Sequence, residues 1–205
     1  MCSHLFLEGP SGVGKTTLLL AELGPLLSWA GGFVTRRLLD ENANTRAFSL
    51  TSPDFSGHSS LPYAPDAPNI FLERDGDRMR WQAEVFIGTG LALLASSAEK
   101  RLILLDEFGG AEILLDAFHA RLLEVLNGGV PCIGVLKSTA HAMKLARTLG
   151  LPEEYLRRHR ELREALLSSP RTRLFSVTTE TRREAGRLVR QFLLPYRSRF
   201  PEGRS

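Results

Sequence analysis

The sequence predicts an α/β fold, with a mainly parallel central sheet covered by helices on both faces. Continuous apolar runs at 4–8, 101–106 and 130–136 predict strands that are buried on both faces, as in parallel sheets. A helical pattern follows each run, and this alternation is typical of helix-covered parallel sheets. A glycine-rich turn at 9–14 joins the first strand to the first helix.

The remaining elements follow from local patterns. We expect strands at 4–8, 32–39, 46–51, 69–74, 78–86, 101–106, 130–136 and 173–177. We expect helices at 15–27, 88–98, 112–126, 138–149, 152–167 and 180–194. Gly24-Pro25 disturbs the first helix and Pro195 stops the last one, because proline lacks a backbone N–H and clashes with the preceding turn. Asp75-Gly76-Asp77 predicts a hairpin.

The length of 205 residues predicts a single domain, 1–205. The segment 32–86 interrupts the strand–helix rhythm with antiparallel pieces and a proline-rich loop at 52–68, so we interpret it as an insertion beside the sheet. The segment 150–172 is predicted to be largely helical and is rich in arginine. No second hydrophobic core is indicated.

Composition sets limits on the class of protein. Apolar residues make up 43% and charged residues 24%, as in ordinary globular proteins. No apolar run reaches the ~18 residues of a membrane span, and no secretory signal is recognisable. Cys2 and Cys132 show no pair spacing, and the five histidines show no metal-ligand spacing. We therefore expect a cytoplasmic protein with no membrane partner.

Charge is distributed unevenly along the chain. Residues 157–205 hold 13 arginines against five acidic residues, whereas the rest of the chain is net acidic. A basic C-terminal quarter is compatible with binding of phosphate or nucleic acid. A solvated helix surface is the simpler interpretation, so we do not expect nucleic acid as a partner. The oligomeric state is left open by the sequence.

The turn after the first strand matches the phosphate-binding pattern G-x-x-x-x-G-K-[ST]. Its glycines let successive N–H groups point inward and form an anion-binding concavity, and the following helix adds the positive end of its dipole. We expect Lys15 to reach the β- and γ-phosphates and the Thr16 hydroxyl to bind Mg²⁺. The predicted nucleotide-binding residues are Gly9, Pro10, Ser11, Gly12, Val13, Gly14, Lys15, Thr16 and Thr17. The predicted partner is a nucleoside triphosphate.

Two acidic residues end the second apolar run. Asp106 stands where a carboxylate can support Mg²⁺ beside the phosphate loop. Glu107 follows directly and can polarise a water molecule against the γ-phosphate. We therefore predict Thr16 and Asp106 as metal ligands, and Glu107 and Lys15 as catalytic residues. No N-K-x-D signature for guanine is present, so the base preference is open.

Together these motifs resemble the nucleoside-triphosphatase family that includes thermophile enzymes and a human cancer-related nucleoside-triphosphatase. The resemblance is carried in order by FLEGPSGVGKTTL at 6–18, GGFVT at 31–35, ILLDEFGGAEIL at 103–114, GVLK at 134–137 and FSVTTETR at 175–182. It implies a P-loop NTPase fold and slow, Mg²⁺-dependent hydrolysis of nucleoside triphosphates to diphosphate and phosphate. It also places Glu112 at the family's second glutamate.

The chain departs from the family at three places. Arg36 and Arg37 stand where the family has acidic residues, and Thr181 replaces an asparagine near the expected base position. The segment 150–172 is longer than in shorter members. Two alternative functions remain open: a small-molecule or nucleoside kinase that uses ATP, and a nucleotide-gated regulatory module.

The arginine-rich segment suggests a specific hypothesis. Three arginines in four positions spread charge around a helix, because neighbouring residues point about 100° apart. We therefore expect the helix to lack a broad buried face and to form a mobile flap beside the nucleotide. In that case Arg157, Arg160 or Arg163 would reach the transferred phosphoryl group. The alternative is a surface helix without a catalytic role, with Arg158, Arg171 and Arg173 as further surface charges.

Overall fold

The computed structural model describes residues 3–54 and 60–197, so Cys2, His58 and part of the predicted loop lie outside the described residues. Within these residues nine strands form one sheet, in the order β6-β5-β3-β2-β7-β8-β1-β9, with β4 beside β2. The strands are β1 (His4–Glu8), β2 (Ala30–Leu39), β3 (Thr45–Thr51), β4 (Ser60–Pro62), β5 (Ile70–Asp75), β6 (Arg78–Trp81), β7 (Leu102–Phe108), β8 (Cys132–Leu136) and β9 (Thr172–Ser176).

The helices lie between these strands as the alternating pattern predicts. They are α1 (Lys15–Leu23), η1 (Gly24–Trp29), η2 (Phe86–Gly90), α2 (Leu91–Ser96), η3 (Ser97–Glu99), η4 (Ala111–Leu114), α3 (Asp116–Asn127), α4 (Thr139–Leu149), α5 (Glu153–Ser168) and α6 (Arg182–Arg197). The α-helix after the phosphate loop ends before Gly24-Pro25, as predicted, and continues as the 3-10 helix η1.

One half of the sheet is parallel. Neighbouring strands from β2 through β7, β8 and β1 to β9 all run in the same direction. Leu5 pairs with Ile133 and Arg173, which fixes the register of three strands at once. Because the strands are parallel, the carboxyl ends of β1, β7 and β8 meet at one edge of the sheet. This edge carries the site described below.

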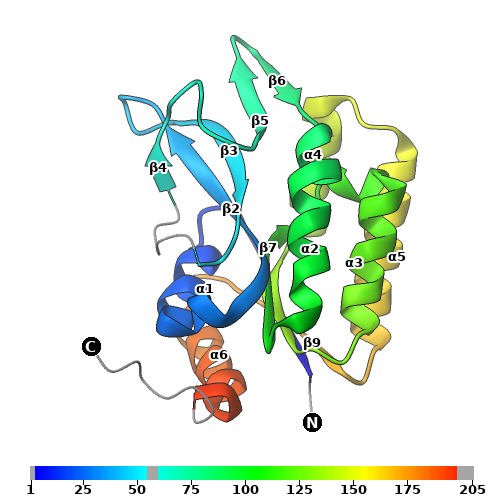
Figure 1. Ribbon diagram of the computed structural model, residues 1–205. Coiled ribbons are helices and arrows are strands. Elements are labelled where there is room, and N and C mark those ends of the chain that lie inside the picture. Colours follow the sequence, from blue (N-terminus) through cyan, green and yellow to red (C-terminus); the bar gives the residue numbers. More distant parts are fainter. Residues whose placement is uncertain (1–2, 55–59, 198–205) are drawn as a thin grey trace.

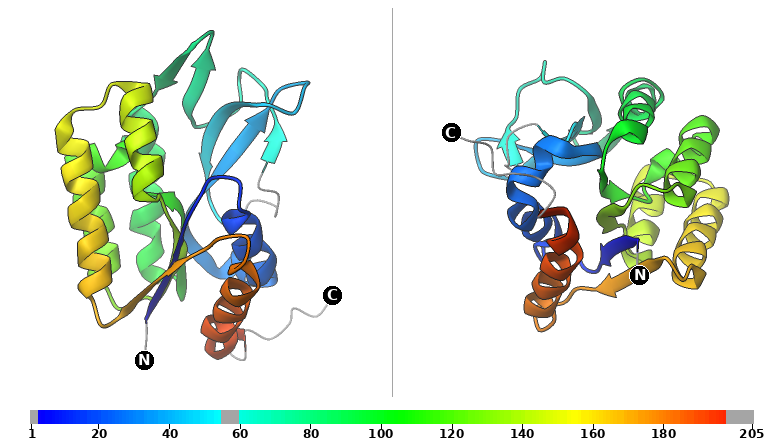
Figure 2. Two further views of the ribbon diagram at one scale, coloured as in Figure 1. Left: turned by 180° about the vertical axis from the view of Figure 1, so that it is seen from behind. Right: turned by 60° about the horizontal axis from the view of Figure 1, so that its bottom comes forward.

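Helices cover both faces of the parallel half (Figure 1). Successive residues of a strand point to opposite faces, so Leu5 and Leu7 pack with α1 and α6, whereas Phe6 packs with α3 and α5. These residues belong to two separate apolar clusters, and the views in Figure 2 show a helix layer on either side of the sheet. The prediction of a three-layer α/β fold with a mainly parallel sheet is confirmed.

The antiparallel segment is part of the sheet itself, which corrects the prediction of an insertion beside it. β2 is ten residues long; its first half pairs in parallel with β7, and its second half pairs antiparallel with β3. β5 and β6 then extend the same sheet as a hairpin. The hairpin's second strand ends at Trp81 rather than at Phe86, which already begins η2.

The last helix differs from the prediction at its end. Pro195 lies inside α6, which continues to Arg197. Its missing N–H removes a single hydrogen bond, and it does so in the final turn, where helix geometry is least constrained. Cys132 is fully buried in the apolar cluster, as predicted for a packing residue.

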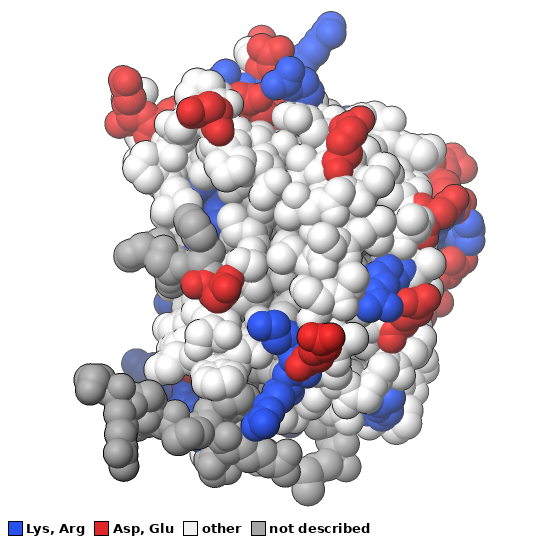
Figure 3. Space-filling view, in the orientation of Figure 1, with Lys and Arg blue, Asp and Glu red and all other residues white. Residues whose placement is uncertain are grey.

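On the face shown in Figure 3, charged side chains gather at the top, along the right-hand edge and in a mixed group on the lower part of the face. The centre of that face carries few charges. Across the described residues no helix is long and apolar enough to span a membrane.

Candidate active site

The predicted phosphate loop connects β1 to α1 at the carboxyl edge of the sheet. Gly9 adopts φ 142°, and a Cβ there would lie 2.2 Å from the carbonyl oxygen of Val177, so only glycine fits. Gly14 adopts φ 88° at the position just before the helix. The Val13 side chain packs on the core under the loop. These contacts explain why the loop needs glycines at the positions that the motif specifies.

Lys15 lies across this loop. Its Nζ donates to the carbonyl oxygens of Gly9 at 2.9 Å and Pro10 at 2.8 Å. Among the residues that the structure describes, no side chain caps the N-terminus of α1, so the first-turn N–H groups are left to bind an anion. Burial is the main cause that lowers the pKa of Lys15; Lys137 and Arg37 add to it, while Glu107 and Asp106 oppose it. Several cations therefore face one small space.

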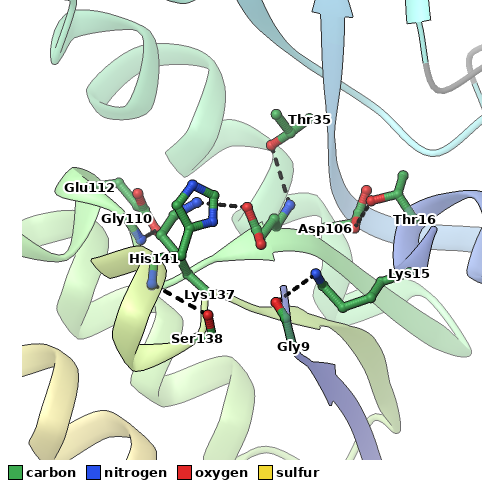
Figure 4. A network of polar contacts seen from close by, with 12 residues as sticks. Gly9, Lys15, Thr16, Thr35, Asp106, Gly110, Glu112, Lys137, Ser138 and His141 are labelled. Atoms are coloured by element: carbon green, nitrogen blue, oxygen red, sulfur yellow. Dashed lines mark hydrogen bonds and ion pairs between the residues drawn. The ribbon is translucent and has the colours of Figure 1, made fainter. Parts of the chain in front are cut away.

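Thr16 and Asp106 meet, as the sequence predicted for two metal ligands. The Thr16 hydroxyl donates to Asp106 Oδ1 at 2.9 Å (Figure 4). Asp106 is 1% exposed, and its Oδ2 is buried without a hydrogen-bond partner among the described residues. Burial raises the pKa of Asp106 to about 7, although the Thr16 hydrogen bond opposes the change. A buried carboxylate oxygen that lacks a donor is a suitable ligand for a cation.

Glu107 is held between β2 and β8. Its carboxylate accepts a hydrogen bond from Lys137 Nζ at 2.6 Å, and its backbone N–H donates to Thr35 Oγ1 at 3.3 Å (Figure 4). Burial acts to raise the pKa of Glu107, but the charge and hydrogen bond of Lys137 outweigh it and lower the pKa. Glu107 is therefore ionised near neutral pH and able to accept a proton.

Glu112 shapes the turn that follows Glu107. It is buried, and its Oε1 accepts a hydrogen bond from the Gly110 N–H at 2.7 Å. Burial raises the pKa of Glu112, although the charge of Lys137 and hydrogen bonds from three backbone N–H groups act to lower it. A side chain this closely engaged with its own turn positions the loop around the site.

His141 belongs to this site, although its sequence context did not indicate it. It lies in the first turn of α4, where its backbone N–H donates to Ser138 Oγ at 3.4 Å. Its ring lies beside Lys137 (Figure 4), and the charge of Glu107 also acts on it. Burial and the charge of Lys137 lower the pKa of His141 to about 4. Its Nδ1 is buried with no hydrogen-bond partner in the described part of the chain. The ring is therefore neutral at pH 7.

The arginine-rich helix α5 is a fixed support of the site, so the flap hypothesis is wrong. Tyr155, His159, Leu162 and Leu166 form a buried stripe with helical spacing. Tyr155 OH donates to Gly109 O at 3.0 Å, and His159 Nε2 contacts Lys137 O at 2.8 Å. Arg163 makes a bidentate ion pair with Glu8, at 3.0 and 2.7 Å.

Three residues four apart on α5 thus contact the ends of β7, β8 and β1. None of the three arginines proposed as fingers lines the cavity. Arg157 pairs with Glu154 and Glu161 on the surface, Arg160 is exposed, and Arg163 is engaged with Glu8. The error arose because Arg157 and Arg160 are exposed, away from the buried stripe, while Arg163 is neutralised by its ion pair with Glu8. The number of arginines therefore did not prevent burial of the other side of the helix.

Arg36 and Arg37, which stand where the resembling family has acidic residues, have different surroundings. Arg36 is 0% exposed, its Nε lies 3.4 Å from Thr51 Oγ1, and burial lowers its pKa while Asp106 opposes that change. Arg37 points to the other face of β2 and lines the cavity. The reversed charge therefore enters the surroundings of both Asp106 and the cavity. Thr181 caps the turn after β9, accepting the Thr178 N–H at 2.8 Å.

Most of the predicted residues border one cavity of about 340 Å³. Gly9, Pro10, Val13 and Asp106 are predicted site residues that do not line it. Its phosphate-loop side is formed by Ser11, Gly12, Gly14, Lys15, Thr16 and Thr17. Glu107, Glu112, Lys137 and His141 line it as well, with Thr35 and Arg37 from β2. In the described residues no three His, Cys, Asp or Glu side chains cluster to hold a metal.

A sequence profile of an NTPase family matches residues 4–188 of the chain. The chain belongs to this NTPase family. No curated protein matches it. The match covers the phosphate loop, both predicted acidic residues, Lys137 and α5 in one continuous stretch.

Two solved structures resemble the NTPase in fold. The crystal structure of THEP1 from the hyperthermophile Aquifex aeolicus aligns with a TM-score of 0.61 at 16% identity, over 93% of this chain and 99% of that one. The solution structure of a human cancer-related nucleoside triphosphatase aligns with a TM-score of 0.56 at 22% identity, over 100% of both chains. The fold of the NTPase is thus that of P-loop NTPases, as predicted from the resemblance.

Proposed function

We propose that this NTPase catalyses Mg²⁺-dependent hydrolysis of nucleoside 5′-triphosphates to the diphosphate and phosphate. The observation that carries the proposal is the contact between Thr16 and Asp106 directly beside Glu107. It brings the Thr16 hydroxyl, an Asp106 oxygen that has no hydrogen-bond partner among the described residues, and the ionised Glu107 carboxylate close to the phosphate loop. The related human protein is described as a nucleoside triphosphatase, which supports the same assignment.

The phosphate loop binds the triphosphate in this proposal. The N–H groups at the start of α1 hold its oxygens, and Lys15 moves from the carbonyl oxygens of Gly9 and Pro10 to the β- and γ-phosphates. Lys137 and Arg37 supply further positive charge on the γ-phosphate side. Preorganised charges of this kind stabilise the charge that develops during transfer.

Thr16 and Asp106 would hold Mg²⁺. When bound, the ion neutralises charge on the β- and γ-phosphates. Glu107 orients a water molecule and accepts its proton, while Lys137 keeps the carboxylate ionised and fixed. His141, neutral and with a free Nδ1 among the described residues, can accept a hydrogen bond from the same water.

Product analysis tests the proposal. Purified protein is incubated with ATP, GTP, CTP, UTP and the deoxy forms, and free phosphate and diphosphate are measured with Mg²⁺ or with EDTA. We expect equal amounts of the two products, with Mg²⁺ only. Glu107→Gln should lower kcat by about 10²–10⁴-fold, the usual contribution of a positioned base.

Glu184→Gln is the matched control, because Glu184 is exposed on α6 outside the cavity. It should keep the wild-type kcat. Nucleotide binding without turnover would instead favour the regulatory-module alternative. Turnover that survives EDTA would refute the metal assignment.

A further inference from the structure

The cavity continues beyond the catalytic groups into a chamber with aromatic walls. Arg37, Phe48, Leu72 and Trp81 are direct partners across β2, β3, β5 and β6, so they form one row on one face of the sheet. All four line the cavity, together with Phe71 and Phe86. We call the space above this row the aromatic chamber.

Helix α4 forms the opposite wall of the aromatic chamber. His141, Leu145 and Leu149 are spaced four residues apart, share one face of α4 and line the cavity. On β2, Thr35 and Arg37 likewise share a face, with Thr35 bonded to Glu107 and Arg37 two residues farther on. Both walls therefore lead away from Glu107, and the chamber opens directly beside that carboxylate.

The chamber is built like a ligand site. Phe48, Phe71 and Trp81 remain only partly buried although they lie in a cluster of rings, with centroids 6.3 Å apart for Phe48 and Phe71 and 6.0 Å for Phe71 and Trp81. Thr35, Thr45 and Arg37 add a few polar groups to these apolar walls. Pockets for small organic ligands combine aromatic walls with a few polar groups in this way.

The order of the strands separates this chamber from the other side of the phosphate loop. β1, which leads into the loop, lies between β8 and β9. Glu107 and the chamber lie on the side of β7, β2 and β3, whereas Arg182 approaches Gly14 from the side of β9. A triphosphate whose γ-phosphate faces Glu107 thus directs its leaving group away from the chamber, since attack occurs in line with departure.

We infer that the aromatic chamber binds a second substrate, a planar aromatic compound that carries a hydroxyl group, as phosphoryl acceptor. The hydroxyl oxygen forms a bond to the γ-phosphorus as the bond to the β–γ bridging oxygen breaks. The nucleoside diphosphate leaves with that electron pair, and the hydroxyl proton passes to the Glu107 carboxylate. This activity goes beyond the proposed hydrolysis and rests on the same phosphate site; water is the competing acceptor.

Binding is tested first, independently of turnover. The chain has two tryptophans, and Trp29 is 51% exposed outside the chamber. In a Trp29→Phe protein, the fluorescence of Trp81 reports the chamber alone. Adenosine, thymidine and pyridoxine are titrated to millimolar concentration in the presence of MgADP. We expect saturable quenching by at least one of these probes.

Transfer is tested next, with ATP labelled at the γ-phosphate and the probe that binds. Labelled probe should appear with Mg²⁺, and the ratio of transfer to hydrolysis should fall by about tenfold or more in Trp81→Ala, the usual effect of losing one stacking ring. Leu149→Trp, which fills the chamber from a half-buried position, should give the same loss and covers the case in which Trp81→Ala does not fold. Trp29→Ala is the matched control and should keep the wild-type ratio.

Three outcomes would overturn the inference. The first is the absence of quenching by every probe. The second is binding without any labelled product while ATP hydrolysis proceeds. The third is a tenfold rise in the KM for ATP in Leu149→Trp, which would mean that the chamber holds the base of the nucleotide itself. If the wild-type protein showed no ATP hydrolysis while a probe still quenched the fluorescence of Trp81, only the proposed function would be contradicted.

Discussion

Arg163 and Arg157 lie on the same helix and offer a matched pair of substitutions. Arg163 makes two hydrogen bonds to Glu8, with 31% and 13% of the two side chains exposed. Hydrogen bonds to charged groups contribute about 1.5–3 kcal/mol, so Arg163→Ala should lower the free energy of unfolding by about 2 kcal/mol. In a chain of this size that corresponds to a fall in Tm of about 4–8 °C. Arg157 is 55% exposed, and ion pairs between exposed side chains contribute little to stability because water and salt screen them.

The assay combines thermal unfolding with phosphate release. Arg157→Ala should lower Tm by less than Arg163→Ala does and leave kcat unchanged. A double-mutant cycle with Glu8→Gln should give a coupling energy of about 1–2 kcal/mol for Arg163. If Arg163→Ala kept the wild-type Tm, showed no coupling to Glu8 and lost kcat by about 10³-fold or more, Arg163 would be an arginine finger and our assignment as an anchor would be refuted.

Three further predictions concern the phosphate and metal sites. Lys15→Ala should nearly abolish ATP binding, because the ammonium neutralises charge on the β- and γ-phosphates. Isothermal titration with ATP measures this, with Lys144→Ala, an exposed lysine on α4, as the control variant. Wild-type ATP affinity in Lys15→Ala would argue against the phosphate loop. Asp106→Asn should raise the Mg²⁺ concentration needed for half-maximal activity while ATP still binds; an unchanged magnesium titration would exclude Asp106 as a ligand. Because the pKa of Asp106 is about 7 and protons compete with the metal, Mg²⁺ affinity should fall about tenfold for each pH unit below 7 and stay level above it; an affinity flat from pH 5 to 8 would contradict this.

The sequence predicted the parallel half of the sheet well, because its strands are short continuous apolar runs. It also placed the phosphate loop directly after β1, and Asp106 and Glu107 at the carboxyl end of an apolar strand; the strand β7 includes both residues and ends at Phe108 rather than at Asp106. It did not predict that β3, β5 and β6 join the same sheet: alternation indicates a strand but does not identify the neighbouring strand. The aromatic chamber depends on the pairing of β3, β5 and β6, so the sequence alone did not predict it.

Side chains from distant segments account for the rest of the site. Lys137 contacts Glu107 although the two residues are 30 positions apart in the sequence, and Thr35 contacts Glu107 from 72 positions away. Local spacing in the sequence cannot predict such contacts. GVLK at 134–137 and GGFVT at 31–35 did contain these residues, but only as a resemblance. His141 had no signal beyond its place just after Ser138, at the start of a helix that follows a buried strand.

Helix α5 has a consequence for how the molecule opens. Tyr155, His159 and Arg163 connect it to the turn after β7, to the end of β8 and to the end of β1. Segments joined in this way tend to exchange their amide hydrogens as one cooperative unit. The loops that carry Glu107 and Lys137 should thus share the protection of α5, and a partner that displaced this one helix would release three parts of the site together.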